Sequence, residues 1–122
     1  MGGKAPIRVR NNTTAGALTA TETSQGYRCR GATRATVTSK VSAFSAGTLD
    51  VKPQIAPEDV AGSYKEINVP PDITEDIVLA QQAGNGVESV TFPLTAEFIR
   101  IVMTGASSPD MGLDVWLQLH FD

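Results

Sequence analysis

The nine residues before Asp122 alternate strictly between apolar and polar side chains. The intervening polar face carries Asp114, Trp116, Gln118 and His120. A repeat of two is the repeat of a β-strand, because successive side chains point to opposite faces of a sheet. Residues 113–121 therefore predict a strand with one face in a hydrophobic core, made of Leu113, Val115, Leu117, Leu119 and Phe121.

Other segments carry related patterns. Residues 34–44 and 48–55 also alternate, although Pro53 predicts an edge position or a bulge because proline has no N–H for strand pairing. Residues 98–103 form an apolar run interrupted only by Arg100, which is typical of a central strand covered on both sides. Weaker strand patterns occupy residues 7–10, 17–21, 27–30, 63–69 and 87–92.

Glycines separate these runs at turn-like intervals, and Thr, Ser, Val, Ala and Gly dominate the composition. About eight short strands with regular turns predict one all-β domain, an antiparallel β-sandwich. Residues 72–82 are the one ambiguous segment. Thr74 could cap a short helix, while an extended loop after Pro70 and Pro71 fits nearly as well, so we expect at most one short helix.

The N-terminal part differs from the rest in charge. Residues 1–40 contain seven Lys and Arg against one Glu, whereas the other 82 residues contain three Lys and Arg against twelve Asp and Glu. Residues 1–25 are also poor in apolar side chains, which predicts an extended N-terminal arm on a β-sandwich domain of residues 26–122. Either the chain's own sheet or a partner would hold this arm. We expect its basic residues and the next two arginines to bind partners: Lys4, Arg8, Arg10, Arg28 and Arg30.

Residue types that perform catalysis are sparse. His120 is the sole histidine, and its place on the outward face favours a solvated or interface role over a general base. Cys29 is the sole cysteine, so no internal disulfide can form, and a core position is the better interpretation. Pairs of carboxylates lack the spacing of a known calcium loop. We therefore expect no enzyme activity, no cofactor and no metal.

Two partner classes are also disfavoured. No stretch approaches the roughly 20 apolar residues that cross a bilayer, so we expect no membrane partner. The acidic remainder would repel phosphate, and Tyr27 alone among the aromatic residues stands beside the arginines, so we expect no nucleic acid.

Two stretches resemble small virion proteins of tailed bacteriophages: ATVTSKVSAFSAGTLDVKPQI at 35–55 and SVTFPLTAEFIRIVMTGASSPDMGLDVWLQLHF at 89–121. The resemblance implies a jelly-roll-like sandwich that serves as a capsid decoration or cement protein. Its partners would be the major capsid protein or other virion subunits. It would be made in the host bacterial cytoplasm and lie on the capsid surface of the virion. The alternative is a neck, tail or fibre-associated module, in the last case one that binds carbohydrate.

Assembly leads to two further expectations. A basic end and an acidic body suit head-to-tail contacts between copies, which predicts a homotrimer. Trp116 on the outward face is either an interface anchor or a residue covered by another segment of the chain, and the sequence leaves both open. We count Trp116 and His120 among the partner-binding residues.

Overall fold

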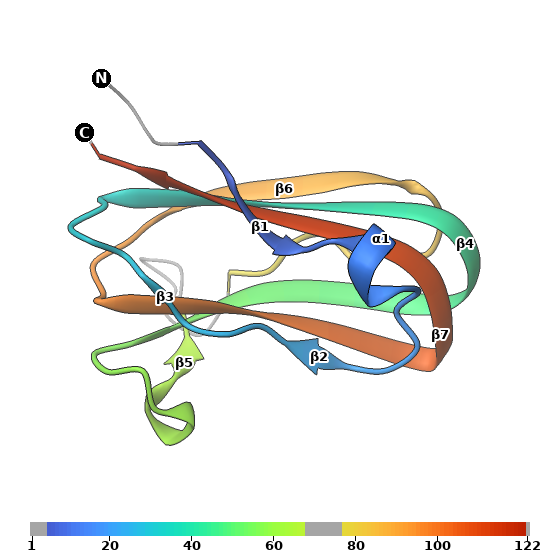
Figure 1. Ribbon diagram of the computed structural model, residues 1–122, viewed down its shortest axis with the longest axis horizontal. Coiled ribbons are helices and arrows are strands. Elements are labelled where there is room, and N and C mark those ends of the chain that lie inside the picture. Colours follow the sequence, from blue (N-terminus) through green and yellow to red (C-terminus); the bar gives the residue numbers. More distant parts are fainter. Residues whose placement is uncertain (1–4, 68–76, 122) are drawn as a thin grey trace.

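The computed structural model describes residues 5–67 and 77–121, and they form an all-β antiparallel structure with one short α-helix (Figure 1). This confirms the predicted fold class. Lys4 and the predicted helix start at Thr74 lie outside the described residues. The elements, in chain order, are β1 (Ile7–Arg10), α1 (Asn12–Ala15), β2 (Glu22–Thr23), β3 (Tyr27–Arg28), β4 (Arg34–Ala56), the 3-10 turn η1 (Ala61–Ser63), β5 (Lys65–Glu66), β6 (Gly86–Pro93) and β7 (Phe98–His120).

Two strands of 23 residues, β4 and β7, form the frame of the domain. They pair antiparallel from Arg34 opposite His120 to Ala56 opposite Phe98. Both strands bend midway, so the single sheet folds over into two layers that face each other (Figure 1). In the first layer β6 and β1 flank β4 and β7, and in the second layer β5 lies beside β4 while β2 and β3 lie beside β7.

The bend explains why the structure has seven strands where the sequence predicts about eight. Gly47 and Gly105 were expected to end strands. Instead the register shifts between Ser42 and Thr48, and pairing then resumes. Gly47 has a φ of +90°, and a Cβ there would lie 2.5 Å from the Cα of Pro109, so a side chain is excluded where the strands cross.

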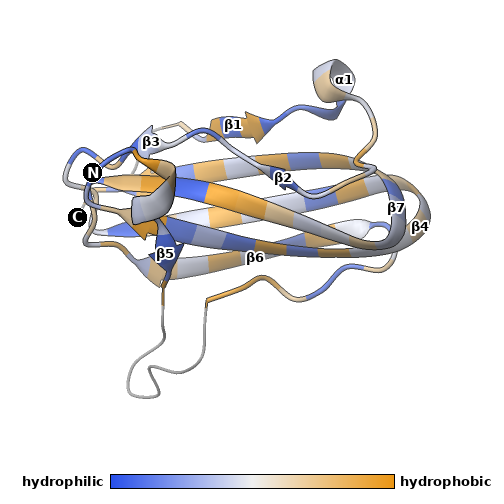
Figure 2. Ribbon diagram, turned by 90° about the horizontal axis from the view of Figure 1, so that it is seen from below, coloured by the Kyte–Doolittle hydropathy of each residue, from blue (hydrophilic) through white to orange (hydrophobic). Residues whose placement is uncertain are grey.

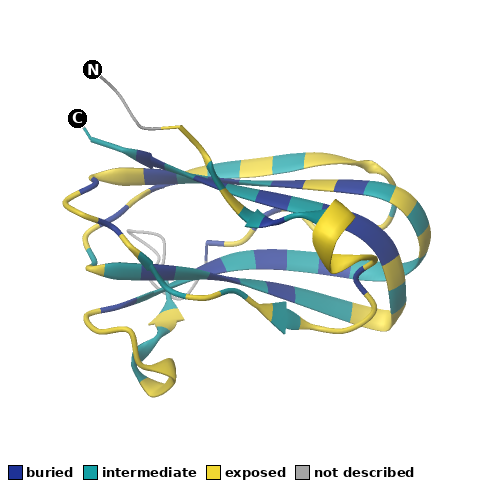
Figure 3. Cartoon of the chain, viewed as in Figure 1, coloured by how far each residue is buried: buried dark blue, intermediate teal, exposed yellow. Residues whose placement is uncertain are grey.

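The core lies between the layers and follows the predicted alternation. Leu113, Val115 and Leu117 are fully buried, whereas Trp116 and the other outward residues of this stretch are intermediate. Bands of opposite hydropathy and of alternating burial run along both long strands (Figures 2 and 3). Burial also alternates along residues 98–103, where Arg100 and its outward neighbours are only partly covered. The prediction that this strand is covered on both faces is therefore wrong.

The predicted N-terminal arm lies on the sheet. β1 pairs with β7, and Leu18 forms a bridge with Met111 and is fully buried. Between them, the Asn11 side chain caps α1 by accepting a hydrogen bond from the backbone N–H of Thr13. Residues 17–21, expected as a strand, contribute only this one bridge. The sequence left open whether the chain's own sheet or a partner holds this arm. In the structure the chain's own sheet contacts residues 7–23.

Candidate partner-binding surfaces

The structure distributes the predicted partner-binding residues over three places. Arg8, Trp116 and His120 lie together on the outward side of the first layer, which we call the outer face. Arg10 is buried. Arg28 and Arg30 lie together at a third place, beside Leu119 at the end of β7 and Phe121.

A ring contact and an ion pair organise the outer face. Arg8 pairs with Trp116 across β1 and β7, and its guanidinium carbon lies 4.6 Å from the centre of the indole ring. The Arg8 Nη2 also donates to Asp114 Oδ1 at 2.7 Å. Partial burial opposes ionisation of Asp114, but the hydrogen bonds from Arg8 and from the Asn12 backbone N–H lower its pKa below the usual value. Trp116 is thus held in place by the N-terminal segment and remains partly exposed.

A row of polar side chains continues the outer face across β7, β4 and β6. His120 Nε2 lies 2.8 Å from Thr36 Oγ1, which lies 2.7 Å from Thr91 Oγ1. Thr38 and Ser89 form the next row, beside Trp116. These short side chains make a polar surface around one large ring, and a polar rim around a buried aromatic residue is the usual arrangement in protein interfaces.

Arg10 has a different role from the one expected of it. Only 4% of the Arg10 surface is exposed. The Nη1 of Arg10 donates to the Leu113 carbonyl at 2.7 Å, and its Nε donates to Glu22 Oε1 at 2.9 Å. A third bond runs from Nη2 to the Gly16 carbonyl at 2.9 Å. The residue therefore fastens the N-terminal segment to β7 and has almost no surface left for a partner, so the partner-binding prediction for Arg10 is wrong.

Arg28 and Arg30 border a small recess at the end of the sandwich. Its volume is about 170 Å³, and Ile7, Leu119 and Phe121 supply most of its apolar lining. Arg28 also lies over the Phe98 ring, with 5.2 Å between its guanidinium carbon and the ring centre. The recess combines an apolar floor with two positive charges. We call it the basic recess.

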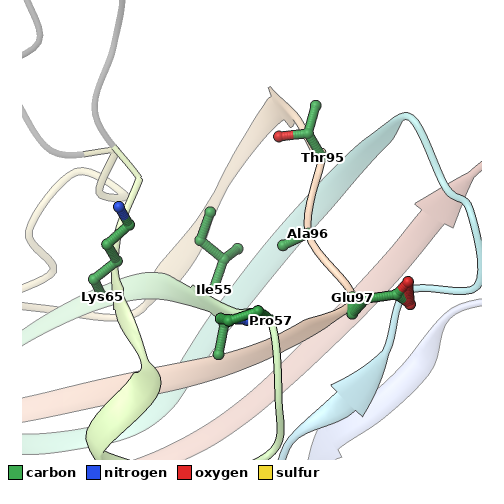
Figure 4. Close-up of a pocket in the computed structure, with 7 residues that line it drawn as sticks. Ile55, Pro57, Lys65, Thr95, Ala96 and Glu97 are labelled. Atoms are coloured by element: carbon green, nitrogen blue, oxygen red, sulfur yellow. The ribbon is translucent and has the colours of Figure 1, made fainter.

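A second recess of about 280 Å³ opens at the same end, between β5 and the turn before β7 (Figure 4). Ile55, Pro57 and Ala96 form its floor. Lys65 stands on one side and Glu97 on the other, so opposite charges flank an apolar surface (Figure 4). This arrangement suits an apolar side chain of a partner.

One polar cluster escaped the sequence reasoning. On the outward side of the second layer, Arg100 Nε donates to Gln54 Oε1 at 2.8 Å, and Gln54 donates in turn to Glu66. The bond from Gln54 is the main cause of the lowered pKa of Glu66. Arg100 also covers the Tyr64 ring at 4.3 Å. The interruption of the apolar run by Arg100 was the one available signal for this cluster.

Cys29 is fully buried, as expected. Burial is the main cause that raises the pKa of its thiol to about 11, and the negative charge of Glu97 adds to it, so the thiol stays protonated. Within residues 5–67 and 77–121, no three His, Cys, Asp or Glu side chains gather closely enough to hold a metal ion. In the same part of the chain, no helix has the length and apolar content needed to span a membrane.

Comparison with known proteins yields a likeness of fold. No protein-family model matches the chain, and no curated protein matches its sequence. Nine chains among solved structures match the fold. One is the crystal structure of the SPBc2 prophage-derived protein YomS, which superposes with a TM-score of 0.60 over 98% of this chain and 95% of that chain at 11% sequence identity.

Proposed function

We propose that the chain is a non-enzymatic structural protein of a tailed bacteriophage, and that it decorates the capsid by binding the major capsid protein. The likeness to a prophage-derived protein supports a phage origin, because it extends over nearly the whole of both chains. The stretches at 35–55 and 89–121 that resemble virion proteins contain nearly all of β4 and the whole of β7, the two long strands of the fold.

The outer face is the surface that we assign to the capsid, and the observation that carries this assignment is the clamped Trp116 ring. Tryptophan and arginine are enriched among residues that dominate binding energy. Arg8 and the flanking strands fix the ring before binding, so little side-chain freedom would be lost in the complex. The contact between His120 and Thr36 fits the same role, as a cross-strand bond that stabilises the binding surface.

Purified particles of the phage or prophage that encodes the chain provide the test. Mass spectrometry should find the protein in many copies per particle, and electron microscopy should place it on the capsid shell. Density at the neck, tail or fibres would replace the decoration role with the alternative, and absence from the particle would refute the proposal.

A binding assay on particles that lack the protein tests the surface itself. Trp116→Ala should weaken binding at least tenfold. Val102→Ala, a matched truncation of a partly covered residue on the outward side of the second layer, should bind like wild type. Equal affinity for both variants and wild type would remove the outer face from the contact.

A further inference from the structure

The end of the sandwich that carries both termini also carries an acidic turn. Residues 57–60 connect β4 to η1, and Glu58, Asp59 and Val60 are all exposed there. Val60 is 53% exposed, which makes it one of three large apolar residues so exposed in the described part of the chain. An exposed apolar side chain that directly follows two exposed carboxylates in a turn is a feature that the proposed capsid contact does not use.

Hydrogen bonds hold this acidic turn in one conformation. The Ser63 N–H donates to the Val60 carbonyl at 2.9 Å, and the Ser63 Oγ donates to Glu58 Oε2 at 2.8 Å. The Tyr64 hydroxyl donates to Asp59 Oδ1 at 2.7 Å. A turn fixed in this way presents Val60 at small entropic cost on binding.

The basic recess is the chemical counterpart of the acidic turn. It has two arginines and an apolar floor, and its volume of about 170 Å³ exceeds the roughly 150 Å³ of an engineered cavity that holds benzene. One valine side chain therefore fits. The charges of the turn and of the recess are opposite in sign, so contact between them would be favoured both on approach and in the complex.

The two surfaces are neighbours on one end of the molecule. Asp59 and Tyr64 pack so closely on Gly26 that a Cβ at Gly26 would clash with both side chains, and Gly26 is two residues from Arg28. In both ribbon views β3, β5 and the chain termini lie at the same end (Figures 1 and 2). A twofold axis through this end would bring each turn to the recess of the other copy, so the contact would form twice.

We propose that a second copy of this chain docks on the basic recess. Val60 of one copy enters the recess of the other, and Glu58 and Asp59 face Arg28 and Arg30. The result is a twofold, end-to-end dimer that leaves the outer face of each copy exposed. It replaces the head-to-tail trimer expected from charge asymmetry as the basic unit, because turn and recess share one end. The pairing does not depend on the proposed capsid role.

Charge reversal provides the test, with mass measured by analytical ultracentrifugation or native mass spectrometry on the full chain. Wild type should be a dimer. Arg30→Glu and Glu58→Arg should each raise the dimer dissociation constant at least tenfold. An equimolar mixture of the two variants should form mixed dimers at wild-type affinity, because one contact then has wild-type residues on both sides and the other has both members of the Arg30–Glu58 pair reversed. Asp110→Arg, an exposed reversal at the bend, should leave the dissociation constant unchanged.

Several results would overturn the inference. They are a monomeric or trimeric wild type, single variants that dimerise normally, or a mixture that stays monomeric although each variant keeps the wild-type circular dichroism and melting temperature. Should a single variant fail to fold, Val60→Asp at the exposed tip is the substitute and should also weaken the dimer tenfold. Particle binding by a variant that no longer dimerises would separate this pairing from the capsid contact.

Discussion

Arg10 and Arg8 lie two residues apart on β1 and provide a matched pair for testing how the N-terminal segment is held. Arg10→Met removes a buried guanidinium that contacts Glu22 and the carbonyls of Leu113 and Gly16. Arg8→Met removes a guanidinium whose side chain is 42% exposed. We expect the first change to cost much more stability than the second.

The magnitude follows from what each change leaves behind. Breaking a buried ion pair costs about 3–5 kcal/mol. The Glu22 side chain is 41% exposed and can be rehydrated, so the lower limit applies, and the buried Leu113 carbonyl accounts for most of it. We expect Arg10→Met to lower the free energy of unfolding by about 3 kcal/mol, and Arg8→Met by about 1 kcal/mol or less. For a chain of 122 residues, 3 kcal/mol corresponds to a fall in melting temperature of roughly 12 °C.

Urea unfolding followed by circular dichroism is the appropriate assay, because both variants should keep the wild-type dependence on urea while the midpoint falls. If Arg10→Met unfolds at the same urea concentration as wild type, or if Arg8→Met is the more damaging change, then Arg10 does not fasten the N-terminal segment to β7.

Three other predictions follow, two on the outer face and one on the bend. Trp116→Ala should lower the stability of the isolated domain by about 1–2 kcal/mol, because the ring is half-buried and one cation–π contact is lost. A loss above about 3 kcal/mol in urea unfolding would identify Trp116 as a core residue. Gly47→Ala should cost at least about 2 kcal/mol, but Gly31→Ala only about 1 kcal/mol, because both have a positive φ and only Gly47 faces the Pro109 backbone; equal melting temperatures would contradict the account of the bend. The lowered pKa of Asp114 contributes stability that is present above its ordinary pKa of about 4 and lost as pH falls through the folded value. The difference in urea midpoint between wild type and Asp114→Asn should therefore shrink as pH falls from 7 toward 2, and a constant difference would contradict this.

The amino-acid sequence by itself determined the class of the fold and much of its core. Alternation along residues 113–121 identified which side chains face inward, because the period of a strand is a local property of the backbone. Weaker patterns of the same kind identified β1 and β6, and the lack of a partner cysteine favoured the buried state of Cys29 that the structure shows. The alternation also placed Trp116 and His120 on the outward side.

Only the tertiary structure decided how these pieces join. Glycines that signal turns became points where β4 and β7 bend without ending, since continued pairing with the opposite strand outweighs the local preference of glycine to end a strand. Five predicted partner-binding basic residues look alike in the sequence, and yet Arg10 became structural while Arg8 joined Trp116. The difference arises from groups far away along the chain, because Arg10 meets the Leu113 carbonyl across a separation of 103 residues. A local pattern records the direction in which a side chain points, but whether that side chain is buried depends on the distant segments that the fold brings against it.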